Sequence, residues 1–227
     1  ALLAFFLAAH VKESPTFNPR RQTLGAIAGS IGRNWKMFLF IVVLMSCFNA
    51  FSHGTQDLYP TFLSKQHGFD KGTVSLLTII GNLGAIVGGV IFGALSEKIG
   101  RRKAIVIAAL LALPVIPLWA YAGGVAALAA GAFLMQVCVQ GAWGVIPVHL
   151  NELSPEEVRG TLPGFTYQLG NFVVAQAAPF QIFLAQSHGN SYSYALAICT
   201  VGVAIAIAVV VSLGPERRGQ EFTRSTV

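Results

Sequence analysis

Charged residues are scarce in this sequence. Lys, Arg, Asp and Glu make up 11% of its 227 residues, against about a quarter in soluble domains. A soluble domain of this length would need many more of them to cover its surface. Hydrophobic residues make up 54%, and the mean hydropathy is +0.65. The composition therefore excludes a soluble globular domain and indicates an integral membrane protein, with the lipid bilayer as its surroundings.

Paired cysteines and cofactor motifs are also lacking. Cys47, Cys138 and Cys199 are far apart, each in a different apolar stretch, which fits neither a zinc site nor a disulfide framework. We therefore expect no metal and no cofactor. The formal net charge is +6, but nucleic-acid binding needs a basic face on a soluble fold. Nucleic acid is not an expected partner.

Glycine, by contrast, is frequent in the apolar stretch 72–95. Gly81, Gly84, Gly88, Gly89 and Gly93 recur there at short intervals. A dinucleotide-binding loop would need a preceding strand and a soluble βαβ unit, whereas these glycines lie in one continuous apolar run. They predict the close approach of a neighbouring helix through small residues.

The long apolar runs predict six membrane-spanning helices, because a bilayer is crossed by about 20 apolar residues. The expected ranges are 36–60, 72–95, 103–122, 124–150, 162–186 and 192–213. Four prolines inside these ranges predict kinks: Pro114, Pro117, Pro147 and Pro179.

The positions of the basic residues predict the orientation. Short cytoplasmic loops carry an excess of Lys and Arg, and thirteen of the fifteen basic residues fall on one side of the six ranges, leaving Lys65 and Lys71 on the other. The thirteen are Lys12, Arg20, Arg21, Arg33, Lys36, Lys98, Arg101, Arg102, Lys103, Arg159, Arg217, Arg218 and Arg224. We expect this side, and the C-terminus, to be cytoplasmic in a multi-pass protein of the plasma or inner membrane.

The same patterns predict four parts of the chain. Residues 1–9 are apolar but too short to span and are expected to be the end of a preceding transmembrane helix. Residues 10–35 are polar and basic, as in a cytoplasmic connector. Residues 36–213 form the six-helix bundle, and 214–227 a cytoplasmic tail. We therefore expect an N-terminal half as the missing partner of this chain.

Two short motifs flank the expected cytoplasmic loops. Residues 93–103, Gly-Ala-Leu-Ser-Glu-Lys-Ile-Gly-Arg-Arg-Lys, combine a glycine turn with an acid and a basic cluster. Residues 152–160, Glu-Leu-Ser-Pro-Glu-Glu-Val-Arg-Gly, combine acid, proline and arginine. Both resemble signatures of the major facilitator superfamily, with Glu97 where an aspartate is usual and Lys98 where an arginine is usual. The resemblance implies an all-α membrane protein, the six-helix C-terminal bundle of a twelve-helix transporter.

These motifs contain the expected gating residues of the cytoplasmic loops. Glu97 could pair with Arg101 or with a neighbouring helix and hold one conformation until transport breaks the contact. A simpler interpretation is that the cluster only anchors the helix end by the positive-inside rule. The residues assigned to this gate are Gly93, Glu97, Gly100, Arg101, Arg102, Glu152 and Arg159.

A polar stripe interrupts the first spanning range. On a helix that turns 100° per residue, Asn49, Ser52, His53, Gln56 and Asp57 fall within an arc of about 140°. Such a face cannot point at lipid, and intramembrane ionisable residues are functional candidates. His53 and Asp57 lie one turn apart and could share a proton. The alternative is a satisfied polar pair that locks this helix to a neighbour.

The same stretch matches the pattern Asn-x-x-Ser/Thr-His-x-Ser/Thr-Gln-Asp-x-x-x-Thr. It resembles helix seven of the fungal lactate and pyruvate permeases and of their bacterial relatives in the sialate and lactate proton symporter family. The resemblance implies a small organic acid anion and a proton as partners. It implies proton coupling by His53 and Asp57. It also implies roles in substrate binding for Asn49, Ser52, Gln56 and Thr61, and an unspecified role for Thr55.

A second polar pair lies in the range 162–186. Gln168 and Asn171 are three residues apart on one helical face, and the matching residues of helix eleven in the same family imply substrate recognition. Their amides could donate to a carboxylate without adding charge. Gln136, Gln140 and Trp143 are weaker candidates. His149 and Glu152 could form an inner proton station, or could simply be solvated at the interface.

The leading hypothesis is a proton-coupled symporter for short monocarboxylates such as lactate and pyruvate, working by alternating access. A sialic acid proton symporter, or another organic-acid transporter of the superfamily, is the close alternative. A sensor derived from a transporter is more distant. An intramembrane enzyme using His53 and Asp57 as acid and base is not expected, because no metal triad or partnered nucleophile accompanies them.

Overall fold

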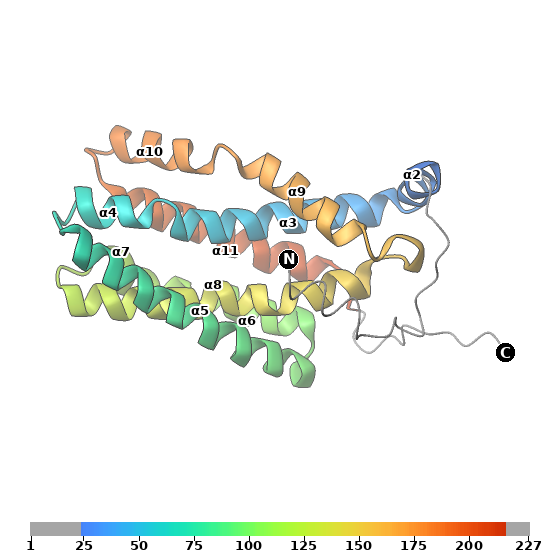
Figure 1. Ribbon diagram of the computed structural model, residues 1–227, viewed down its shortest axis with the longest axis horizontal. Coiled ribbons are helices and arrows are strands. Elements are labelled where there is room, and N and C mark those ends of the chain that lie inside the picture. Colours follow the sequence, from blue (N-terminus) through green and yellow to red (C-terminus); the bar gives the residue numbers. More distant parts are fainter. Residues whose placement is uncertain (1–23, 217–227) are drawn as a thin grey trace, which may run out of the picture.

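The computed structural model describes residues 24–216, which form a bundle of long helices (Figure 1). The helices are α2 (Leu24–Arg33), α3 (Trp35–Gln56), α4 (Tyr59–Lys65), α5 (Lys71–Ile99), α6 (Arg101–Leu111), α7 (Ile116–Ala120), α8 (Val125–Leu153), α9 (Leu162–Val174), α10 (Ala177–Ser187) and α11 (Tyr192–Leu213), with 3-10 turns η1 (Leu113–Val115) and η2 (Glu156–Val158). The expected helix end at 1–9, most of the connector and most of the tail lie outside the described residues. The limits of the four parts stay predictions.

The six expected spanning ranges are all helical in the structure. Five units are long and apolar enough to cross a bilayer: Trp35–Lys65, Lys71–Ile99, Arg101–Ala120, Val125–Leu153 and Tyr192–Leu213. The sixth range, 162–186, is split into α9 and α10, which have 13 and 11 residues. Because the described residues contain no strand, the predicted all-α membrane class is confirmed.

Two of the breaks lie four residues before a proline. Pro179 lacks the N–H group that would bond to the carbonyl of Ala175, and its ring clashes with that carbonyl; α9 ends one residue earlier and α10 begins two residues later. In the same way Pro60 deprives Gln56 of a donor, and α3 ends at Gln56. The helical path therefore changes at two places, after Gln56 and after Val174.

The other prolines behave differently. Pro114 and Pro117 lie in η1 and in the first turn of α7, where the unpaired first-turn positions of a helix tolerate the missing N–H. Pro147 lies inside α8, which continues through it. The kink predicted at Pro114 and Pro117 therefore corresponds to the break between α6 and α7. At Pro147 the helix α8 is not interrupted.

Helices α5 and α8 pack closely over their whole length because of glycines. A Cβ atom at Gly84 would overlap the backbone of Phe133, and one at Gly88 would overlap the backbone of Val137. Glycine is therefore required at both positions for the two backbones to approach. The predicted small-residue contact is confirmed, and its partner is α8.

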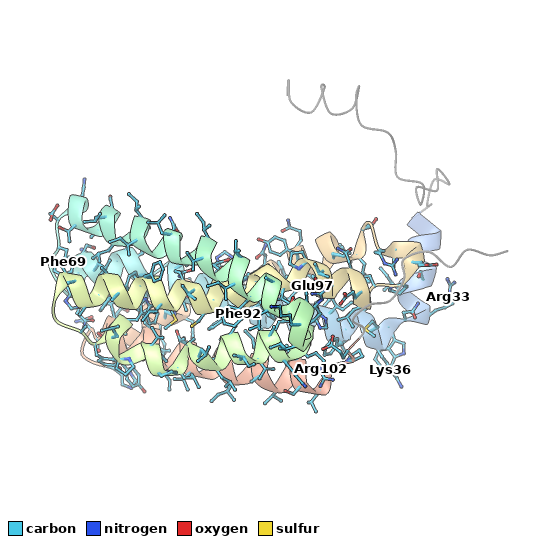
Figure 2. All side chains as sticks on the ribbon, turned by 90° about the horizontal axis from the view of Figure 1, so that it is seen from below. Arg33, Lys36, Phe69, Phe92, Glu97 and Arg102 are labelled. Carbon is cyan, nitrogen blue, oxygen red and sulfur yellow. The ribbon has the colours of Figure 1, made fainter. Side chains whose placement is uncertain are left out.

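Charge divides the bundle into two unlike ends. Arg33, Lys36, Glu97 and Arg102 all lie toward one end of the bundle, and Phe69 lies at the other end (Figure 2). We call the first the basic end and the second the opposite end. The grouping agrees with the distribution of Lys and Arg that the sequence predicts.

The outer face of α5 is apolar. Leu76, Ile79, Leu83, Ile86 and Val90 follow one another at intervals of three or four residues, and each is more than half exposed. A stripe of this size on a water-soluble surface would be unfavourable. It is a surface for lipid chains or for another layer of helices.

Candidate functional site

The break between α3 and α4 positions the predicted polar residues. Asp57 follows the last residue of α3 and is still helical, with φ −67° and ψ −41°, and its N–H donates to the His53 carbonyl at 3.0 Å. His53 and Asp57 therefore remain on one face, one turn apart. The break follows directly, so the pair lies where the helix ends.

His53 and Asp57 contact each other as expected. Nδ1 of His53 lies 3.0 Å from Oδ2 of Asp57. Their side chains are 43% and 48% exposed, so the pair is open on one side. An imidazole and a carboxylate at this distance can hold one proton between them.

Ser52 joins this face to α8. Its Oγ accepts hydrogen bonds from Nε2 of Gln56 at 2.8 Å and from Nε2 of Gln140 at 3.3 Å. A hydroxyl oxygen has two acceptor lone pairs, and the two amides occupy both. The Ser52 hydroxyl can then only donate its own hydrogen bond to a further partner, which suits an anionic ligand.

Asn49, in contrast, is buried between α3 and α9. It is 1% exposed, and its Nδ2 donates to the Tyr167 carbonyl at 3.1 Å. A Cβ atom at Gly170 would lie 2.8 Å from Nδ2, so glycine there makes room for the amide. In this conformation Asn49 acts as a helix-to-helix contact, and its expected role in substrate binding stays a prediction.

The two threonines of the motif do not join the His53–Asp57 face. Thr55 is buried, and its hydroxyl donates to the carbonyl of Phe51 at 2.8 Å within its own helix. Thr61 lies beyond the break, half-buried on α4. The structure therefore brings together Ser52, His53, Gln56 and Asp57 but not the whole motif.

A cavity of about 60 Å³ lies beside this face. Its lining residues are Thr55, Gln56, Tyr59, Pro60, Leu77, Thr78, Gly81, Asn82, Trp119, Ala132 and Gln136. The volume admits a few water molecules and is well below the roughly 300–1,000 Å³ of small-molecule pockets. Thr78 and Asn82 were missed in the sequence, although both are polar residues one turn apart within an apolar run.

Gln168 and Asn171 also meet as predicted. Nδ2 of Asn171 lies 3.4 Å from Oε1 of Gln168, and Gln168 is exposed. They lie on α9, whose neighbouring residue Tyr167 holds Asn49 of α3. Trp143, a weaker candidate, packs instead against Phe48.

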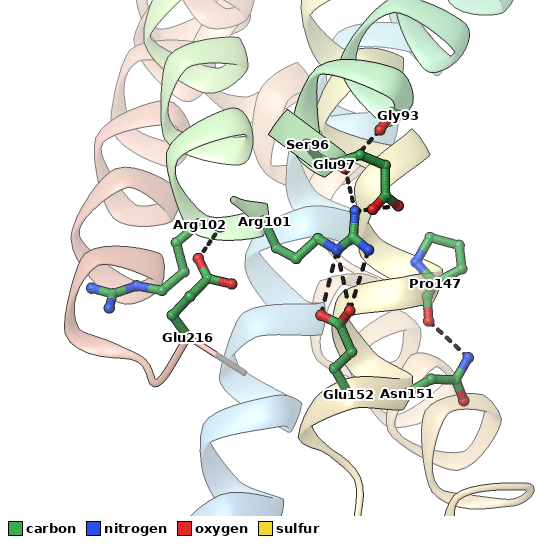
Figure 3. A network of polar contacts seen from close by, with 9 residues as sticks. All are labelled: Gly93, Ser96, Glu97, Arg101, Arg102, Pro147, Asn151, Glu152 and Glu216. Atoms are coloured by element: carbon green, nitrogen blue, oxygen red, sulfur yellow. Dashed lines mark hydrogen bonds and ion pairs between the residues drawn. The ribbon is translucent and has the colours of Figure 1, made fainter. Parts of the chain in front are cut away.

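At the basic end, Arg101 connects the two loop motifs (Figure 3). Its guanidinium lies 2.7 Å from Oε1 of Glu97 and 3.2 Å from Oε1 of Glu152, and it donates to Oγ of Ser96 at 2.7 Å. Arg101 is 5% exposed. Glu97 thus pairs with Arg101, the first of the two contacts considered for it, and Arg101 also bonds to Glu152 of α8. The gating role of these residues stays a prediction.

Gly100 and Arg102 continue this network toward the end of α11. Gly100 has φ +98°, a conformation that side chains with a Cβ rarely adopt. The N–H of Arg102 donates to Oε2 of Glu216 at 3.0 Å, and its guanidinium donates to the carbonyls of Val211 and Ser212. The glycine turn therefore ties α6 to the segment after α11.

The other two gate residues have local contacts. Arg159 donates to the carbonyls of Asn151 at 3.1 Å and Ser154 at 3.4 Å, which closes the loop after α8. The Gly93 carbonyl accepts from Oγ of Ser96 at 2.7 Å. All seven expected gate residues lie at the basic end, although only some of them contact one another.

His149 is fully buried, at 0% exposure. Solvation at the membrane interface therefore does not explain it. Neither ring nitrogen has a hydrogen-bond partner among the described residues. One ligand atom each from His149, Glu152 and Glu216 lies within 4.8 Å of the others.

A sequence profile described as "Major Facilitator Superfamily" matches residues 39–226. The chain belongs to the major facilitator superfamily. The match covers all six helical units, from α3 to the segment after α11. It agrees with the two loop motifs that meet at Arg101.

Two curated proteins are informative relatives of this chain. The "Carboxylic acid transporter protein homolog" of Saccharomyces cerevisiae is 36% identical over 169 residues, which cover 74% of this chain and 27% of the yeast protein. The "Sialic acid transporter NanX" of Escherichia coli is 25% identical over 151 residues, covering 62% of this chain and 36% of NanX. The chain spans less than half of either relative.

The fold has a counterpart among solved structures. The crystal structure of a double-tryptophan mutant of XylE superposes with a TM-score of 0.63 at 20% sequence identity. The match covers 84% of this chain and 48% of XylE. At this identity the likeness concerns the fold alone. The chain matches about half of a longer protein.

Proposed function

We propose that this chain is part of a proton-coupled symporter for short monocarboxylates, such as lactate and pyruvate, that works by alternating access. The observation that carries the proposal is the His53–Asp57 pair, 3.0 Å apart and half-exposed on a membrane-spanning helix. The carboxylic acid transporter homologue of yeast supports an acid as the substrate.

The pair explains how a proton and an anion can move together. With neutral His53 and ionised Asp57 the pair carries one negative charge, which repels a carboxylate. A bound proton neutralises the pair and removes this repulsion. An anion then binds well only after the proton, and both are carried as a neutral load.

Neutral donors on α3 and on α9 suit the recognition of a carboxylate. The Ser52 hydroxyl is left with its donor function, and Gln56 and Gln168 carry amide donors. The cavity beside Gln56 is too small to enclose a substrate by itself. We therefore expect the pocket to be completed by a second six-helix half outside this chain, which would also supply a cation for the carboxylate.

The basic end is proposed as the cytoplasmic end, because short cytoplasmic loops are rich in Lys and Arg. The Arg101 network would then hold the cytoplasmic ends of α5, α6 and α8 together in one of the transport states. With this orientation the C-terminus is cytoplasmic, and the proposed location of the chain is the plasma or inner membrane.

Sialic acid is the second candidate substrate, and the relationship to NanX supports it. Both candidates carry one carboxylate, so the same neutral donors serve them. They differ in size, and the volume of the complete pocket decides between them.

Uptake by the whole transporter tests the proposal. Cells that lack their own acid carriers are given labelled lactate or labelled sialic acid at external pH 5 and pH 7. We expect lactate uptake that is faster at the lower pH and is abolished by a protonophore. Uptake of sialic acid without uptake of lactate would identify sialic acid as the substrate. Uptake that is insensitive to the protonophore would contradict the symport mechanism.

A further inference from the structure

The buried imidazole of His149 is unexplained by packing. It is 0% exposed, and both nitrogens are buried without a partner among the described residues. An unpaired ring nitrogen in such a place costs desolvation free energy. Its position between two carboxylates points to a ligand that the imidazole and the carboxylates can bind together.

The three groups come from two segments that meet at the basic end. His149 and Glu152 are three residues apart on α8, and Glu216 follows α11. Their ligand atoms lie within 4.8 Å of one another. Ligand atoms about 2 Å from a tetrahedral zinc ion lie about 3.3 Å apart, so a contraction of up to about 1.5 Å completes the site. One nitrogen and two carboxylate oxygens suit a first-row divalent ion and leave one position open.

The neighbouring arginines do not close the site. Glu216 accepts a neutral backbone N–H of Arg102, whose guanidinium is bound to carbonyls of α11. Glu152 does bind Arg101, at the rather long distances of 3.2–3.4 Å. Arg101 keeps Glu97 and Ser96, both at 2.7 Å, if Glu152 turns away.

We propose that His149, Glu152 and Glu216 form a binding site for a divalent transition metal ion of the zinc class. Binding draws the carboxylate of Glu152 from Arg101 and connects the end of α8 to the segment after α11. The ion would thus stabilise one arrangement of the basic end. The site is independent of the proposed substrate and of proton coupling.

Metal titration of the purified protein tests the site. The protein is held in detergent micelles with an affinity tag that contains no histidine, and Zn²⁺ is titrated against a chromogenic chelator. We expect one zinc ion per chain, and a loss of affinity of more than about tenfold in His149→Asn and in Glu216→Gln. Glu216 is exposed, so its variant keeps the test valid if loss of His149 disturbs folding.

A matched control is His188→Asn, since His188 is exposed at the end of α10. We expect its affinity for Zn²⁺ to equal that of the parent. With Co²⁺ in place of zinc, the parent should show the visible absorption of a tetrahedral ion, and both site variants should lose it. Undiminished zinc affinity in Glu216→Gln, or an equal loss in His188→Asn, would overturn the proposal.

Discussion

Arg101 at the start of α6 and Glu152 near the end of α8 form a buried ion pair, with 3.2 Å between nitrogen and oxygen, although 51 positions separate them in the sequence. The pair joins the motifs at residues 93–103 and 152–160, each of which alone shows only a resemblance to the superfamily. Arg101 also holds Glu97 of α5. One guanidinium thus connects three helices, and the opening of this contact during transport stays a prediction.

Replacing Glu152 by Gln should destabilise the protein by about 3 kcal/mol, the lower end of the range for breaking a buried pair. The cost is limited because Arg101 keeps its contact with Glu97. Thermal unfolding in detergent, followed by tryptophan fluorescence, measures it. The matched control is Glu97→Gln, whose carboxylate is 64% exposed and should cost less than about 1 kcal/mol. Equal losses in both variants would contradict the assignment.

A single methyl group at Gly84 should disturb the contact between α5 and α8. The Cβ atom of Gly84→Ala overlaps the backbone of Phe133, so the helices must separate at a cost of about 1–3 kcal/mol. Gly202→Ala in α11 is the control, since nothing lies within 4 Å of its Cβ position. It should raise stability by about 0.5–1 kcal/mol. Thermal unfolding in detergent distinguishes the two directions.

The start of α5 should depend on pH through Asp70. The hydroxyl of Thr73, followed by the N–H groups of Thr73 and Gly72, lowers the pKa of this exposed carboxyl below its ordinary value of 3.8. A lowered pKa means that the cap stabilises the fold above the ordinary value and is lost as pH falls through the folded one. The difference in melting temperature between parent and Asp70→Asn should therefore change below about pH 4. Parallel pH curves would contradict it.

Local patterns were sufficient for the elements and for contacts within one helix. Apolar runs predict the spans, and the spacing of His53 and Asp57, or of Gln168 and Asn171, predicts their contacts because a helix fixes the distance between residues three or four apart. The glycines of α5 predict a close neighbour without saying which helix it is. The break before Pro179 could also have been placed, since the lost hydrogen bond lies four residues earlier.

Contacts between distant segments could not be predicted from local sequence patterns. Glu216 approaches His149 only because α11 returns beside α6, which itself packs on α8, and nothing in either segment specifies this partner. The same holds for Asn49, whose amide faces the Tyr167 carbonyl of α9 instead of the polar face of its own helix. Every residue has a backbone carbonyl, so the amino-acid sequence does not indicate which carbonyl Asn49 binds.

Gln168→Ala in the complete transporter should raise the Michaelis constant for the acid by about fivefold, equivalent to one lost hydrogen bond of about 1 kcal/mol. The maximal rate should change little, because a neutral donor binds the substrate equally in each step. Initial rates of labelled lactate uptake give both constants. Gln186→Ala, an exposed glutamine near the end of α10, is the control. An unchanged constant and an unchanged substrate profile would remove Gln168 from the binding site.

His53→Ala and Asp57→Asn should each reduce proton-driven uptake to background, because the pair that holds the proton is broken. Asp57→Asn carries a neutral amide that resembles the protonated acid, so exchange of labelled for unlabelled substrate, which needs no net proton movement, should be retained. Controls are Asp70→Asn, which keeps a capping side chain, and His188→Ala. Uptake that still responds to a pH gradient in both pair variants would show that the proton is carried elsewhere.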